Sequence, residues 1–165
     1  MNILEVKNLN MSYKTIDGMV EAVKNVSFSV KEGEAFGIVG ESGCGKTSVA
    51  MSLLQLQADN GEITSGEIIF NGKDIVGLNE SELREIRWSG ISIVFQGAMN
   101  SWNPVVKIGE QIREAMREHY PNKTKEENSK KIIELFNIVG LNETIMDRFP
   151  HELSGGMKQR AVIAL

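Results

Sequence analysis

The sequence predicts an α/β protein in which a strand-rich first part is followed by a helical part. Up to residue 96, apolar residues fall into short runs of strand character, separated by polar or glycine-containing turns. From residue 97 to residue 153 they recur at helical spacing, and no convincing strand pattern occurs. A glycine-rich loop at residues 40–48 joins a continuous apolar run to a helical run. This loop is therefore the first place to look for a function.

The composition describes one soluble globular domain. The chain has 165 residues, of which 41% are hydrophobic and 24% charged. A net charge of −4 provides no basic field for nucleic acid, so no nucleic-acid partner is expected. The single cysteine excludes an internal disulfide and fits a reducing compartment. We find neither a membrane-spanning apolar run nor a signal peptide, and we expect a protein of the cytoplasm.

The first strands differ in their expected burial. Strands are predicted at residues 3–6, 9–13, 26–30 and 35–39. In the third, Val26, Phe28 and Val30 alternate with two serines, which is typical of a half-buried strand. The fourth, "AFGIV", is apolar throughout and is expected to be buried on both faces of a parallel sheet.

The next elements are marked by turns and caps. A helix is expected from Lys46 to about Gln57. Residues 65–75 predict a strand, a turn at Asn71-Gly72 and a short continuation. Another helix is expected near Asn79, with Glu82 in capping-box position, and "ISIVF" at residues 91–95 predicts a second buried strand.

One helix of the second part is defined at both ends. Thr124 and Glu127 have capping-box spacing, and Gly140 is placed to end the helix. Between them runs an apolar stripe formed by Ile132, Ile133, Leu135, Phe136 and Val139.

The loop "GESGCGKTS" carries the G-x-x-x-x-G-K-[ST] pattern of a P-loop. Its glycines allow the backbone to form a nest of N–H groups around phosphate, next to the positive end of a helix. We expect Lys46 to neutralise the β- and γ-phosphates of a nucleotide and the Thr47 hydroxyl to bind Mg²⁺, although kinases, GTPases, helicases and transport ATPases all carry this loop. The other expected phosphate-binding residues of the loop are Gly40, Ser42, Gly43, Cys44, Gly45 and Ser48. The alternative is an ordinary glycine-rich turn that enters a helix.

Cys44 occupies a variable position of this pattern, and we interpret it as a small space-filling residue. If the loop holds phosphate, alkylation of the thiol should impair ATP binding, and ATP should protect the thiol.

A second motif, "LSGG" followed by "QR", resembles the signature of ATP-binding cassette (ABC) proteins. In that family the signature residues, here Ser154, Gly155 and Gly156, bind the γ-phosphate of an ATP held by the opposite subunit. A serine N-cap with two glycines opening an ordinary helix is the alternative interpretation.

Two further positions resemble the same family. Gln96 matches the Q-loop glutamine, which implies contact with Mg²⁺ and water; the alternative is a polar residue that ends a strand. Tyr13 resembles the ring that stacks on adenine; the alternative is an edge-strand tyrosine.

The resemblance implies a P-loop (RecA-like) ABC ATPase core, with an N-terminal antiparallel β part and a helical subdomain. It divides the chain into an ATP-binding core at residues 1–96, a helical subdomain at 97–153 and the signature with its helix at 154–165. The run "GAMNSWNPVVKIGEQI" is similar to peptide and nickel importers, except for Trp102 in place of leucine. One expectation is that Trp102, Asn103 and Pro104 form a surface that meets a membrane partner. The alternative is that the tryptophan is buried in its own subdomain.

The implied function is that of an importer's ATP-binding subunit, driving uptake of peptides or a similar small solute. The implied partners are a second ATP-binding subunit (identical or different), transmembrane permease subunits and, indirectly, a solute-binding protein, at the cytoplasmic face of the membrane. The Walker B aspartate and glutamate of the family are not found. We therefore expect the C-terminal part of the core to be missing, and the chain by itself to bind ATP without hydrolysing it. The alternatives are a soluble ABC ATPase acting on DNA or ribosomes, and a nucleotide-binding or assembly module only.

Overall fold

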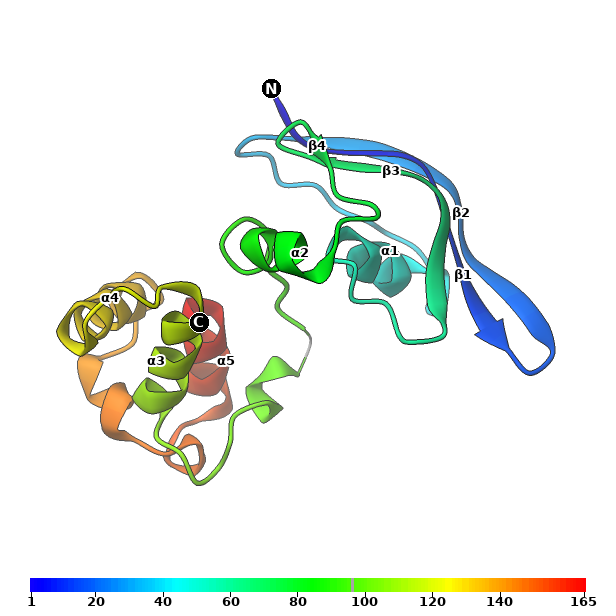
Figure 1. Ribbon diagram of the computed structural model, residues 1–165. Coiled ribbons are helices and arrows are strands. Elements are labelled where there is room, and N and C mark those ends of the chain that lie inside the picture. The colour runs from blue at the N-terminus through cyan, green and yellow to red at the C-terminus, as the bar shows by residue number, and fades with distance from the viewer. Residues whose placement is uncertain (96) are drawn as a thin grey trace. The chain divides into compact units, whose positions relative to one another are not determined.

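A computed structural model describes residues 1–95 and 97–165 of the protein (Figure 1). The chain forms two compact units, Met1–Ser92 and Ile93–Leu165. The first contains all the strands among the described residues, and the second is helical.

The first unit is built on a four-stranded antiparallel sheet. Its strands lie in the order β2 (Gly18–Lys31), β1 (Asn2–Thr15), β3 (Gly61–Phe70) and β4 (Lys73–Asp74). The two strands expected at residues 3–6 and 9–13 are one long strand, β1, whose register shifts between Val6 and Leu9. Asn8 at this irregularity has a φ of 48°, a conformation that asparagine tolerates better than most residues. β1 therefore continues through a bulge where the sequence pattern breaks.

The predicted turn between β3 and β4 is confirmed. Asn71 and Gly72 have φ angles of 48° and 81°, and positive φ at both central residues is the requirement of a type I′ hairpin turn. The expected alternation in β2 is also confirmed, since Phe28 is partly buried and Ser27 and Ser29 are exposed.

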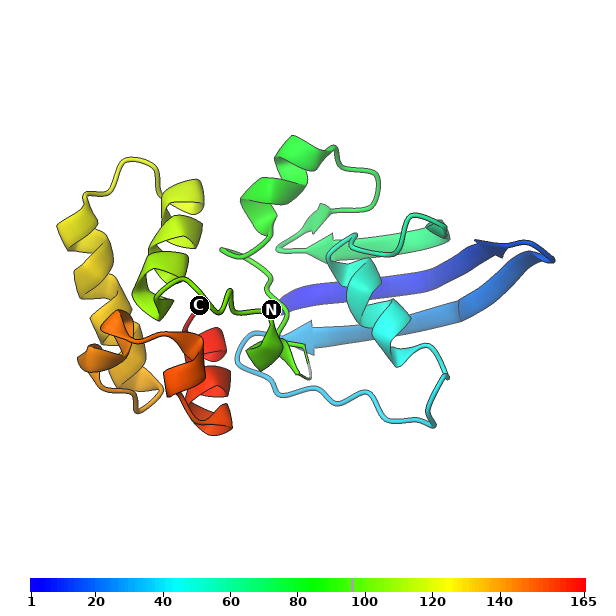
Figure 2. The ribbon, with the colours of Figure 1, turned by 90° about the horizontal axis from the view of Figure 1, so that it is seen from below.

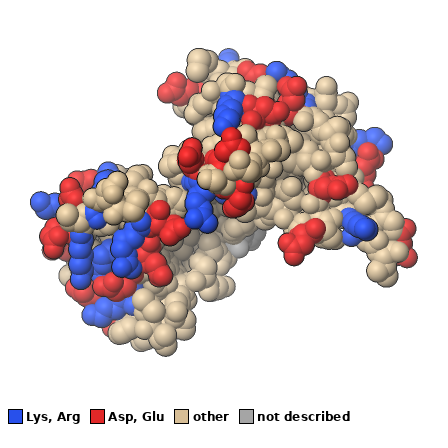
Figure 3. Space-filling view, in the orientation of Figure 1, with Lys and Arg blue, Asp and Glu red and all other residues tan. Residues whose placement is uncertain are grey.

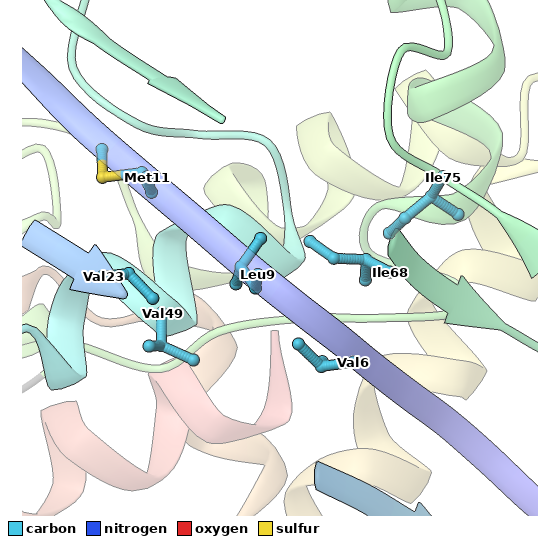
Figure 4. Packing of buried hydrophobic residues seen from close by; sticks show 7 residues of the cluster. All are labelled: Val6, Leu9, Met11, Val23, Val49, Ile68 and Ile75. Carbon is cyan, nitrogen blue, oxygen red and sulfur yellow. The ribbon is translucent and has the colours of Figure 1, made fainter. Parts of the chain in front are cut away.

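The core of the first unit lies between the sheet and α1 (Lys46–Leu53), which covers one face of the sheet in both Figure 1 and Figure 2. Seven buried side chains from β1, β2, β3, α1 and the segment after β4 meet there (Figure 4). They are Val6, Leu9, Met11, Val23, Val49, Ile68 and Ile75. The first residues of α1, which follow the glycine-rich loop, are thus anchored through Val49.

Two strand predictions are wrong. Residues 35–39 and 92–95 form no strand, and Ile91 makes only an isolated bridge to Arg87. Instead of being buried, Val39 is 95% exposed and Phe36 is 46% exposed. A buried parallel strand needs hydrogen-bonded neighbours on both sides, and the described residues supply none for either segment.

The predicted helix start at Asn79 is confirmed, whereas the predicted end of the first helix is not. α2 (Glu80–Ile86) begins after Asn79, and Asn79 and Glu82 form the expected capping box. α1 ends at Leu53, four residues earlier than expected.

The second unit consists of three α-helices and three 3₁₀ turns among its described residues. The helices are α3 (Ile108–His119), α4 (Lys125–Ile138) and α5 (Gly155–Ala164). The turns are η1 (Ala98–Asn100), η2 (Glu143–Asp147) and η3 (Pro150–Glu152). α4 packs against α3 and α5, and it begins with the predicted capping box of Thr124 and Glu127. Within the described part of the chain, no helix has both the length and the apolar character needed to span a membrane.

Candidate functional site

The loop at residues 40–48 takes a path that its glycines make possible. Gly43 and Gly45 have φ angles of 82° and 90°, in the left-handed region that favours glycine. A Cβ on Gly45 would collide with the carbonyl oxygen of Ala22 in β2, and a Cβ on Gly40 would lie 2.6 Å from the Cys44 sulfur. The loop is therefore folded tightly on itself and against β2.

The helix after the loop begins with free backbone donors. Gly45 is the N-cap of α1, no side chain caps this end, and the first turn carries no acidic residue. The N-terminal N–H groups of a helix are unpaired within it and carry a partial positive charge. An anion at this position would satisfy them, as phosphate does in a P-loop.

Lys46 folds back over the loop. Its Nζ donates hydrogen bonds to the carbonyl oxygens of Gly40, at 2.9 Å, and Glu41, at 2.6 Å, and lies 3.6 Å from the sulfur of Cys44. The ammonium group is thus held at the centre of the loop by neutral acceptors. A phosphate oxygen would offer the same group a charged, stronger acceptor.

A hollow of about 550 Å³ opens beside the loop. Its wall combines β1, β2 and the start of α1, and its lining residues include Tyr13, Glu21, Ala22 and Lys46. The antiparallel pairing of β1 with β2 brings Tyr13 here from a position far from the loop in sequence. The contribution of Glu21 and Ala22 was not predicted, because no motif marks them and only the strand register places them.

The hydroxyl residues of α1 lie in two different environments. Thr47 is exposed and lines the hollow, and no hydrogen bond of its hydroxyl occurs among the described residues. Ser48 is buried, and its hydroxyl lies 3.2 Å from the Tyr13 hydroxyl. Of the predicted loop residues, Gly43, Cys44, Gly45, Lys46, Thr47 and Ser48 line the hollow together with Tyr13. Gly40 and Ser42 belong to the loop but are not part of this lining.

The second motif forms the start of α5 in the other unit. Ser154 is the N-cap, and its Oγ accepts a hydrogen bond from the Met157 N–H at 3.3 Å. Gly155 and Gly156 are exposed in the first turn. The serine thus caps a helix, and its own hydroxyl proton remains available to a further acceptor. Gln96 lies outside the described residues.

Trp102 is buried in its own unit, at 7% exposure, and its Nε1 donates to the carbonyl oxygen of Lys158 at 3.4 Å. Asn103 is held by two backbone hydrogen bonds with the side chain of Gln111. Burial of the tryptophan in its own subdomain is therefore the interpretation that the structure supports.

Comparison with known proteins identifies relatives over nearly the whole chain. The ABC transporter family matches residues 23–165. The chain is 42% identical to the dipeptide transport ATP-binding protein DppD of Lactococcus lactis subsp. cremoris, covering 99% of this chain and 47% of that protein. It is 43% identical to the oligopeptide transport ATP-binding protein OppD of Bacillus subtilis, covering 99% and 46%. The chain thus spans about half the length of the curated relatives it matches.

Solved structures with the same fold include a dimeric bacterial ABC transporter cassette, with a TM-score of 0.79 and 28% identity, covering 98% of this chain and 67% of that one. A post-hydrolysis state of such a cassette, bound to ADP and Pi, gives a TM-score of 0.78 at 28% identity, with the same coverage. The predicted α/β cassette fold, with an antiparallel β part and a helical part, is confirmed.

Proposed function

Because the chain belongs to the ABC transporter family, we propose that it is the ATP-binding part of a peptide importer. The observation that carries this proposal is the glycine-rich loop, with Lys46 at its centre and the uncapped start of α1 beside it. The loop offers a cation and free N–H groups to one phosphate chain, which is what ATP binding requires. The names of the relatives supply the peptide cargo.

The residues of the loop have separate roles in this proposal. Lys46 exchanges its carbonyl partners for β- and γ-phosphate oxygens, while the backbone N–H groups from Gly43 to Ser48 surround the phosphates. Thr47 fits a Mg²⁺ site, since its hydroxyl is exposed toward the hollow and an oxygen ligand suits this hard cation. Mg²⁺ would neutralise charge on the phosphates there.

Tyr13 provides the base-binding surface of the proposed site. Tyr13 lines the hollow, so its aromatic ring lies beside the loop. Its hydroxyl lies 3.2 Å from the Ser48 hydroxyl, and this contact holds the ring near the start of α1. Stacking on a ring favours a purine base without reading its hydrogen-bonding edge.

The remaining predicted residues complete the site. Gln96 would contact the Mg²⁺ and a water molecule beside the γ-phosphate. Ser154, Gly155 and Gly156 would bind the γ-phosphate of ATP held by a second ATP-binding subunit, and the free proton of the Ser154 hydroxyl supports this. The proposed partners are transmembrane permease subunits and, indirectly, a solute-binding protein. The proposed location is peripheral, at the cytoplasmic face of the membrane. Hydrolysis of ATP by the assembled transporter would drive the peptide's uptake.

The relatives do not favour a soluble ABC ATPase acting on DNA or ribosomes, since those named are peptide transport proteins. A module that only binds nucleotide is the second candidate, because the loop and the hollow beside it have the geometry of a binding site.

Peptide uptake by the intact transporter tests the proposal. Lys46→Ala in the transporter that contains this chain should abolish ATP-driven uptake of a labelled dipeptide, because the phosphates lose their cation. Lys130→Ala removes an equal charge from an exposed position on α4 and should leave uptake unchanged. Uptake that persists in Lys46→Ala would contradict the proposal. Loss of ATP binding without any effect on peptide uptake would favour the nucleotide-binding module.

A further inference from the structure

A basic pocket lies in the second unit, at the meeting of α3 with the start of α4. Six residues line it: Glu110, Arg113, Arg117, Lys123, Lys125 and Asn128. Its volume is about 150 Å³. Figure 3 shows blue basic side chains gathered over α3 and α4 of this unit. The proposed function makes no use of this pocket.

The one carboxylate of the pocket is already paired. Glu110 forms an ion pair with Arg113 at 2.5 Å. The hydrogen bond from Arg113 and its charge lower the pKa of Glu110, and the charges of Lys125 and Arg117 lower it further. Four basic groups thus face one ionised carboxylate, which leaves the lining with three positive charges in excess. A net positive lining favours an anion.

The remaining cations are available to a ligand. Neither Arg117 nor Lys125 takes part in an ion pair among the described residues. Lys123 lies over the ring of Tyr120, with its Nζ 4.5 Å from the ring centroid. Lys125 is the first residue of α4 and is exposed.

An unpartnered buried side chain points to a ligand independently of the charges. Asn128 lines the pocket at 2% exposure, and its Oδ1 has no hydrogen-bond partner. The Nε of Arg113 is also buried without a partner. Buried polar groups in folded proteins are nearly always hydrogen-bonded, because burial removes their hydrogen bonds to water and an unpaired group has no bond to replace them. Two such groups in one small basic pocket indicate that a polar ligand completes it.

We propose that this pocket binds a phosphate group, either inorganic phosphate or a small phosphate monoester. Its oxygens would accept from the guanidinium groups of Arg113 and Arg117 and from Lys125, pairings that are charge-assisted. The hydroxyl of a hydrogen phosphate ion would donate to Asn128 Oδ1; with the amide rotated, the amide N–H₂ would donate to a phosphate oxygen instead. The site lies in the helical unit and is separate from the glycine-rich loop.

Phosphate titration followed by backbone amide NMR on the full chain tests the proposal. Inorganic phosphate should shift the resonances of residues lining the pocket, in addition to any shift in the loop at residues 40–48. Arg117→Gln/Lys125→Gln should weaken the binding measured at α4 by at least about tenfold, since two charge-assisted contacts are lost. Lys130→Gln/Lys131→Gln also removes two positive charges, from exposed positions on α4 outside the pocket, and its phosphate affinity should match that of the parent.

A second variant tests the pocket by a substitution that removes none of its cations. Asn128→Asp keeps the size of the side chain but places a carboxylate in the pocket, and it should abolish the α4 shifts while the loop shifts remain. Vesicles of phosphatidylcholine with and without phosphatidic acid test a lipid source. Broadening of α4 resonances by phosphatidic acid, without shifts from inorganic phosphate, would assign the pocket to a lipid headgroup and overturn the proposal of a small ligand. Phosphate shifts confined to the loop, or equal affinities in the pocket and control variants, would overturn the proposal.

Discussion

At the scale of single residues, the ammonium group of Lys46 holds the loop together through hydrogen bonds to two of its backbone carbonyl oxygens. The positions of Gly45 and Lys46 in the motif could be predicted from its spacing, and the structure places Gly45 at the N-cap of α1. Tyr13 needed the resemblance to a family, since nothing in its neighbouring sequence indicates a contact with Ser48 across 35 positions. Ala22, whose carbonyl leaves no space for a Cβ on Gly45, could not have been found from sequence.

Tyr13 allows a prediction that separates its ring from its hydroxyl. Tyr13→Ala should weaken binding of Mg-ATP by about tenfold, because stacking of a base on an aromatic ring contributes ~1–3 kcal/mol. Tyr13→Phe removes the hydrogen bond with Ser48 but keeps the ring, and should bind Mg-ATP about as tightly as the parent. Isothermal titration calorimetry measures both. Equal affinities for Tyr13→Ala and the parent would show that the ring does not contact the nucleotide.

At the scale of elements, caps and turns were predictable, and buried strands were not. The capping boxes at Asn79 and Thr124 and the Asn71-Gly72 turn each depend on residues within a few positions of one another. A strand at residues 35–39 or 91–95 depends instead on neighbours that another part of a chain must supply. Apolar composition alone indicated burial, but it could not provide the partner strands.

The packing of α4 can be tested with two of its side chains. Phe136 is 0% exposed, and Phe136→Ala should lower the free energy of unfolding by ~3–5 kcal/mol, because it removes a buried ring and leaves a cavity. Ile138 in the same helix is 79% exposed, and Ile138→Ala should change it by no more than about 0.5 kcal/mol. Chemical denaturation, with hydrogen exchange followed in α4, gives both values. Similar losses in the two variants would contradict the placement of this helix.

The capping box of α4 predicts a pH dependence. The Thr124 N–H donates to Glu127 Oε2 at 2.8 Å, and the Glu127 N–H donates to Thr124 Oγ1 at 3.2 Å. The hydrogen bond from the Thr124 backbone N–H to the carboxylate, and after it a side-chain hydrogen bond with Thr124, lower the pKa of Glu127 in the folded state. A lowered folded-state pKa stabilises the fold above the unfolded-state pKa, and this contribution is lost as the pH falls through the folded-state pKa.

The parent chain should therefore be more stable than Glu127→Gln at neutral pH, and the difference should disappear in acid. Glu126→Gln removes a neighbouring first-turn charge but leaves the capping box intact. The free energy of unfolding should therefore differ from that of the parent, in a pH-dependent way, more for Glu127→Gln than for Glu126→Gln. Urea denaturation across the acid range provides the comparison. A difference that does not change with pH would mean that the carboxylate does not form the cap.

At the scale of the whole molecule, the division into a strand-rich and a helical part was visible in the sequence, whereas the architecture of the hollow was not. The hollow exists because β1 and β2 pair over fourteen residues each and bring Tyr13, Glu21 and Ala22 to the start of α1. That register depends on bulges and long-range pairing. The glycine-rich loop lies wholly in the first unit, and the motif at Ser154 lies in the second. Each is positioned by its own helix start.

The rate of alkylation of Cys44 tests the central claim, that residues 40–48 hold the phosphates of ATP. Cys44 is exposed, is the only cysteine of the chain and lies 3.6 Å from Lys46 Nζ, so the signal comes from the loop alone. Saturating Mg-ATP should slow the reaction of the thiol with iodoacetamide by about tenfold or more in the parent chain. At an Mg-ATP concentration of about ten times Kd, only about one molecule in ten has an empty loop and a reactive thiol. The same concentration should give little protection in Lys46→Ala. Equal alkylation rates with and without Mg-ATP in the parent chain would contradict the account.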